Sequence, residues 1–145
     1  MSEESGASAL PGRPELRPGL TGEFSLVVGP EQTAASVGND AELTVLSTPH
    51  LLGLVEAACY TAVKPALPPE QRVVGVAVTL EHLAPTPVGE RVTARATLTG
   101  VDGARLRFDV TVDDEHERVG KARMESYAVD LARFQGRLAR KQGQG

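Results

Sequence analysis

Two side chains with acid–base chemistry stand out in this 145-residue sequence, and Glu56 is the first. It is the only charged residue between His50 and Lys64, within a stretch that predicts a mostly apolar helix. An ionised carboxylate in apolar surroundings is costly unless it is paired or used. We therefore interpret Glu56 as a candidate general base or nucleophile, in preference to a carboxylate that merely lies at the helix rim.

His82 is the second candidate, and Thr48 is a third residue that could assist. A lone histidine that ends a predicted strand is more often structural than catalytic. Ser47 or Thr48 would be an ordinary N-cap ahead of Pro49, although a hydroxyl at a helix N-terminus can also bind a substrate oxygen or position a water. Eight residues of helix span roughly 12 Å. Thr48 and Glu56 therefore share one site only if Thr48 lies in a folded-back loop, or if substrate or a partner subunit bridges the gap.

The remaining candidates are weaker. His50 lies at an exposed-looking helix start, His116 lies in a charged turn, and Cys59 has the helical spacing of a packing residue. The sequence lacks the GxSxG, GxxxxGK[ST], GxGxxG and HExxH motifs. With one cysteine and no paired Cys/His spacing, it predicts no disulfide and no metal site, and we expect no cofactor.

Composition indicates one globular domain. The chain is 41% hydrophobic, its formal net charge is −4, and its pI near 5.4 argues against a nucleic-acid or anionic-membrane surface. The N-terminal stretch has two early glutamates and no apolar run typical of a targeting signal, so we expect a cytoplasmic protein. We predict a mobile arm over residues 1–20, a domain over 21–138 and a tail over 139–145.

Periodicity predicts the elements that position these residues. A short strand over 22–28 precedes the helix, and a meander of period-two segments follows from residue 72, with a last amphipathic helix near the C-terminus. Strict alternation in the first long strand places His82 on one face and Gly75 on the other. The pattern predicts an α+β fold with one long helix packed on an antiparallel sheet. Its open edges favour a homodimer or a dimer of dimers.

Taken together, the segments STPHLLGLVEAA and VGVAVTLEHLAPTPVGE resemble the hotdog-fold thioesterases related to fluoroacetyl-CoA thioesterase. The resemblance covers about residues 22–136. It implies a sheet wrapped around the central helix, an acyl-CoA substrate, and a dimer with active sites between subunits. It also implies catalytic roles for Thr48, Glu56 and His82, and a place for Gly75 beside the acyl thioester.

Two departures from the family pattern concern substrate recognition. In the last strand, the family's His and Arg positions fall on Met124 and Ser126 in this sequence. The aromatic lid ahead of the catalytic Thr is also missing, because no Phe or Tyr lies between Phe24 and Tyr60. The sequence therefore does not support specificity for fluoroacetate.

The leading hypothesis is hydrolysis of an acyl-CoA thioester to the free acid and CoA. In it, Glu56 acts as base or nucleophile, His82 as acid or base, and Thr48 orients water or the thioester carbonyl. The alternative is a non-catalytic acyl-CoA-binding or regulatory module, which would need neither Glu56 nor His82. A hotdog hydratase ranks last, because Asp40 and His50 are ten residues apart rather than five.

Overall fold

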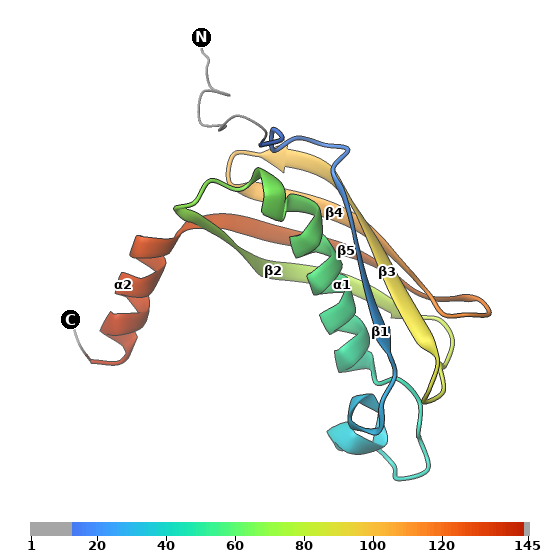
Figure 1. Cartoon of the computed structure of the whole chain (residues 1–145). Coiled ribbons are helices and arrows are strands. Elements are labelled where there is room, and N and C mark those ends of the chain that lie inside the picture. The colour runs from blue at the N-terminus through green and yellow to red at the C-terminus, as the bar shows by residue number, and fades with distance from the viewer. Residues whose placement is uncertain (1–12, 144–145) are drawn as a thin grey trace.

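The computed structural model describes residues 13–143, which form a curled five-stranded sheet and a long helix packed against it (Figure 1). All strand pairings are antiparallel, in the order β1-β3-β4-β5-β2. This arrangement confirms the predicted α+β fold. The elements are β1 (Thr21–Val27), η2 (Pro30–Gln32), η3 (Ala35–Val37), α1 (Thr48–Val63), η4 (Lys64–Ala66), β2 (Gln71–His82), β3 (Arg91–Asp102), β4 (Arg105–Asp113), β5 (Arg118–Asp130) and α2 (Leu131–Lys141).

Helix α1 supplies one side of the core. Its buried residues recur at helical spacing and meet the inward side chains of β3, β4 and β5 in one hydrophobic cluster. The helix packs chiefly against β1 and β3, whereas β2 at the sheet edge has few contacts with it. The helix face toward β2 therefore carries exposed residues, among them Glu56 and Tyr60.

A β-bulge interrupts β2, and it overturns the strict alternation expected for this strand. Gly75 pairs with Ser126, but the next aligned pair is Ala77 with Glu125, so one extra residue is accommodated. Paired residues share a face of an antiparallel sheet. The buried, helix-facing residues of β5 therefore show that Gly75 lies on the same face as His82, which pairs with Gly120.

Two segments near the predicted domain boundaries have defined places in the structure. Leu16 and Leu20 pack against the core, and the Gly19 amide donates a hydrogen bond to the Leu98 carbonyl at 2.8 Å. Residues 13–20 are therefore part of the packed domain. The first twelve residues of the predicted arm lie outside the described residues. At the other end α2 continues to Lys141, past the expected boundary at 138. Within residues 13–143, no helix combines the length and apolar character of a membrane span.

A close approach between β1 and α1 requires glycine at position 22. A Cβ atom placed there would meet the backbone nitrogen of Ala62, and it would lie 2.6 Å from the Ala58 carbonyl oxygen. Both neighbours are helix backbone, which cannot move aside as a flexible side chain can.

We predict that Gly22→Ala lowers the free energy of unfolding by about 1–3 kcal/mol, because overpacking against backbone forces the strand away from the helix. Chemical denaturation followed by circular dichroism measures it. Gly136→Ala is the matched control, because a Cβ there would lie 3.7 Å from the Arg140 side chain, an ordinary contact. Equal stability of the two variants would contradict this account.

Candidate active site

Thr48 and His82 form one half of the candidate site. The Thr48 Oγ1 atom lies 2.8 Å from His82 Nδ1, which joins the first residue of α1 to the last residue of β2. Thr48 is not the N-cap, because the Ser47 hydroxyl accepts a hydrogen bond from the His50 amide. Capping is therefore performed by Ser47, and the Thr48 hydroxyl is left to interact with the histidine.

His82 is half-buried at the end of β2. Burial lowers the pKa of its imidazole below the ordinary value, because desolvation disfavours the charged form. The lowered pKa therefore favours the neutral form of the ring at pH 7. A neutral imidazole can accept a proton at one nitrogen and donate from the other, as acid–base catalysis requires.

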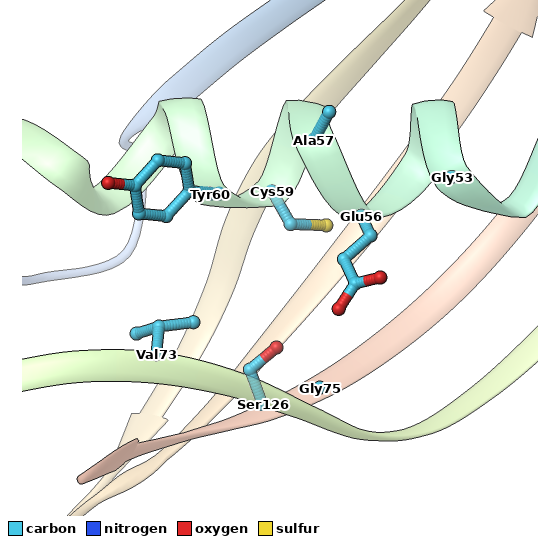
Figure 2. Close-up of a pocket in the computed structure, with 8 residues that line it drawn as sticks. All are labelled: Gly53, Glu56, Ala57, Cys59, Tyr60, Val73, Gly75 and Ser126. Atoms are coloured by element: carbon cyan, nitrogen blue, oxygen red, sulfur yellow. The ribbon is translucent and has the colours of Figure 1, made fainter.

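Glu56 and Gly75 form the second half. They line a pocket of about 370 Å³ between α1 and the β2–β5 pair, together with Gly53, Ala57, Cys59, Tyr60, Val73 and Ser126 (Figure 2). The Glu56 side chain points from the helix toward the strands, as Figure 2 shows. A Cβ at Gly75 would lie 3.2 Å from Glu56 Oε2 and 2.9 Å from Met124 Cε, so glycine leaves room beside the carboxylate.

The surroundings of Glu56 differ from those inferred from the sequence. The residue is exposed in the single chain, and its carboxylate makes no hydrogen bond or ion pair with residues 13–143. The sequence suggested an apolar environment because the flanking helix residues are apolar. Most of those side chains turn toward the core instead, so the carboxylate is free to interact with a substrate or a water.

Cys59 occupies the wall of this pocket as a packing residue, as predicted. It is buried, and burial together with the nearby Glu56 carboxylate raises the pKa of its thiol to about 12. A thiol with that pKa remains protonated at neutral pH and is a poor nucleophile. Of these two side chains, the Glu56 carboxylate is therefore the better candidate for a reactive group.

Ser126 was not recognised from the sequence as a pocket residue. It is buried opposite Gly75 on β5, and its hydroxyl points into the pocket (Figure 2). The signal in the sequence was the resemblance to the thioesterase family, which implies an arginine at the position that Ser126 occupies in this chain. A short hydroxyl here leaves space that a long arginine side chain would fill.

His50 and His116 are separate from both half-sites. The His50 Nδ1 atom lies 2.6 Å from the Ser47 hydroxyl. The His116 Nε2 atom lies 2.9 Å from a Glu90 carboxylate oxygen in an exposed turn. Both histidines therefore have local structural partners, in agreement with the weaker interpretation that the sequence gave them.

The structure thus brings Thr48 to His82, and Glu56 to Gly75, but it does not unite the two pairs within one chain. Two turns of α1 separate Thr48 from Glu56, roughly 12 Å along an ideal helix. Thr48 and Glu56 are exposed and His82 is half-buried, and the outer edge of β2 is unpaired within residues 13–143.

The curled sheet, the single packed helix and these polar pairs define a hotdog-fold thioesterase. A crystal structure of fluoroacetyl-CoA thioesterase superposes with a TM-score of 0.81 at 31% identity, covering 88% of this chain and 98% of that one. A thioesterase-superfamily protein of Thermus thermophilus superposes with a TM-score of 0.81 at 25% identity, covering 93% of this chain and 97% of that one.

Sequence comparison identifies the family within this class. Residues 28–132 match the model of the fluoroacetyl-CoA-specific thioesterases, and the chain belongs to that family. The fluoroacetyl-CoA thioesterase of Streptantibioticus cattleyicolor is 34% identical over 97 residues, which cover 67% of this chain and 70% of that protein. These matches confirm the predicted acyl-CoA thioesterase on a hotdog fold. They favour an enzyme over the non-catalytic module and over the hydratase.

We predict that the His82 imidazole titrates below the ordinary ~6.5. Because its pKa is lower in the folded than in the unfolded state, the folded state binds fewer protons, and stability falls as pH drops through ~6.5 to the folded pKa. Nuclear magnetic resonance titration of the imidazole signals measures the midpoint, and the spectrum of His82→Ala assigns it. A midpoint at or above the ordinary value would show that burial does not control this histidine.

Proposed function

We propose that acyl-CoA hydrolysis takes place at an interface between two copies of the chain, where Thr48 and His82 of one copy meet the partner's Glu56. The observation that carries this proposal is the pairing of Thr48 with His82 at 2.8 Å, two helical turns away from Glu56. A site that needs all three groups is incomplete in one chain. A second copy can complete it without distorting either half.

The edge strand β2 is the surface that suits a second copy. Its outer edge is unpaired within residues 13–143, and Val76 and Val78 are 49% and 39% exposed. Such an edge is a template for pairing with another strand. Symmetric dimers use the same patch on both subunits, so two β2 strands would pair with each other about a two-fold axis.

The bulge in β2 decides which residues such pairing brings together. If the bulge counts as one position of the ladder, Gly75 and His82 lie three positions on either side of Thr79. An axis at Thr79 would therefore set Gly75 opposite the partner's His82. That register would also bring Glu56, which overlies Gly75, toward the partner's Thr48 and His82.

The proposed hydrolysis follows from what the three side chains can do: Glu56 can accept a proton, His82 can transfer one, and the Thr48 hydroxyl can form hydrogen bonds. Glu56 takes a proton from a water molecule whose oxygen attacks the thioester carbonyl carbon, and the carbon–sulfur bond breaks as the tetrahedral intermediate collapses. His82 relays the proton to the departing CoA sulfur, and the Thr48 hydroxyl orients the carbonyl or the water. In a variant route, a Glu56 carboxylate oxygen attacks the carbonyl carbon, the carbon–sulfur bond breaks and CoA leaves as a thiolate. Water then hydrolyses the resulting anhydride, releasing the acid and regenerating Glu56, and the proton lost by this water reaches the thiolate through His82.

We propose that the acyl group of the substrate is short and that the site does not select acyl groups that carry fluorine. The pocket beside Glu56 has a volume of about 370 Å³, part of which the thioester itself would occupy. The segment that would carry an aromatic lid contains Glu42, Leu43 and Thr44, and all three are exposed. Fluoroacetyl-CoA is the substrate named for relatives of this chain, and a panel of short acyl-CoA thioesters with thiol detection would rank it against acetyl-CoA.

We predict that Glu56→Gln lowers kcat at least ~10²-fold, since that is the usual contribution of an acid–base group, and leaves the fold intact because Gln has the same shape. Steady-state hydrolysis with thiol detection measures the rate. Glu117→Gln is the matched control, because Glu117 is exposed in the turn between β4 and β5, outside β2 and outside the pocket that holds Glu56, and has no ion pair in residues 13–143. Wild-type turnover in Glu56→Gln would contradict a catalytic role for Glu56 and would leave it as a solvated residue on the surface of α1.

Mixing two inactive variants tests whether the site is shared. In a dimer of Glu56→Gln with His82→Ala, one site contains both substitutions and the other contains neither. Random subunit exchange should therefore restore about a quarter of wild-type activity, because half of the dimers have one intact site of two. If all three residues acted within one chain, no mixture would recover activity. Light scattering on each variant confirms that it remains a dimer, and a monomeric wild type would refute the shared site.

A further inference from the structure

The C-terminal helix α2 concentrates positive charge on an otherwise acidic chain. It carries Arg133, Arg137, Arg140 and Lys141 and no acidic residue between Leu131 and Lys141. Asp130 caps it by accepting a hydrogen bond from the Arg133 amide at 3.1 Å. Figure 1 shows α2 standing away from the sheet beyond the end of β5, and none of its residues is buried.

Three of these arginines face one cleft. Arg133, Arg137 and Arg140 recur at helical spacing and so share a side of α2. They line a hollow of about 750 Å³ against the end of β5, together with Ala128, Val129, Asp130, Ala132, Phe134 and Gly136. The lining therefore carries three positive charges against the single negative charge of Asp130, which caps the helix.

These arginines differ from most of those on the sheet, where Arg72 and Arg91 are the two without an ion pair among residues 13–143. Arg95, Arg105, Arg107, Arg118 and Arg123 all form ion pairs with carboxylates of neighbouring strands. The guanidinium groups of Arg133, Arg137 and Arg140 make no ion pair or hydrogen bond with the residues from 13 to 143. Three unneutralised guanidinium groups around one hollow are suited to an anion with several phosphate oxygens.

The cleft lies next to the pocket that holds Glu56, farther along β5. Val73 lines that pocket and pairs with Ala128, which lines the cleft. Ser126 lies two residues before Ala128 on β5, so the two hollows follow one another along the strand. The path from Ser126 to Asp130 covers ~13 Å of strand, and Arg133 to Arg140 adds roughly 10 Å of helix.

We infer that this cleft binds the phosphate groups of the CoA nucleotide, with Arg133, Arg137 and Arg140 as the phosphate ligands. The inference rests on the proposed function, because it assumes that the thioester lies beside Glu56. The pantetheine arm would then extend along the end of β5, and the diphosphate and ribose phosphate would reach α2. This assigns the anionic half of the substrate to a helix outside the sheet, at a distance from the reacting atoms.

An anionic membrane surface is the other ligand that a basic amphipathic helix can take. The observations favour CoA, because the arginines point into a hollow shared with β5 rather than standing on a free convex face. Phosphate binding in a hollow next to the acyl pocket also uses all three arginines on one ligand.

The test compares two substrates that share a thioester and differ in the nucleotide: acetyl-CoA and S-acetyl-N-acetylcysteamine. Arg137→Gln should raise KM for acetyl-CoA about tenfold, and replacing all three arginines about a hundredfold or more, with kcat little changed. KM for the cysteamine thioester should not change. Lys141→Gln is the charge-matched control, because it removes one positive charge of the same helix outside the cleft.

Calorimetric titration of free CoA against pantetheine separates this inference from the proposed catalytic site. Wild type should bind CoA more tightly than pantetheine, and the triple variant should bind the two alike, even if Glu56→Gln proves fully active. Unchanged CoA affinity in the triple variant would overturn the inference. Loss of binding to phosphatidylserine vesicles in that variant, with CoA affinity retained, would overturn it in favour of a membrane surface.

Discussion

The β-bulge in β2 is the constraint on which the candidate site depends. Gly75 and His82 are seven residues apart, and in a regular strand an odd separation sends two side chains to opposite faces of the sheet. The extra residue before Ala77 restores the register, so both residues face α1. Without it, either the glycine would not lie under Glu56 or the histidine would not meet Thr48. One irregular residue therefore sets both halves of the site on the same side of the sheet.

Much of the fold was predictable because it follows from the spacing of apolar residues and from the capping and turn residues at the ends of the elements. The helix start at Ser47 and Pro49, the meander after residue 71 and the apolar face of β3 all follow from residue spacing alone. The bulge was not predictable in the same way, because alternation continues unbroken in the letters VVGVAVTLEH while the backbone pairing shifts. A single sequence records which residues are apolar, but not which residue of a partner strand each one faces.

The same limit explains which features of the candidate site residues could be inferred from the sequence. Glu56 and His82 stood out as candidates because a charged or titratable side chain is conspicuous in an apolar segment. The exposure of Glu56 was not, because it depends on how far α1 lies from β2 across the sheet. Ser126 is an ordinary serine in the sequence and becomes a pocket residue only through its pairing with Gly75. Likewise, Leu16 and Leu20 in a Pro- and Gly-rich stretch gave no periodic signal, yet they pack against the core.

Ser47 caps the helix while Thr48 contacts His82, and this separation of roles affects how the site can change over evolution. Ser47 is buried and satisfies the His50 amide, so the folding of α1 depends on that serine. The neighbouring Thr48 is exposed and makes its side-chain contact with His82 instead. In the proposed mechanism, substitutions at position 48 can therefore change how the substrate is bound while the helix start stays in place. In a protein where one residue both capped the helix and contacted the substrate, each substitution at that position would also lower the stability of the fold.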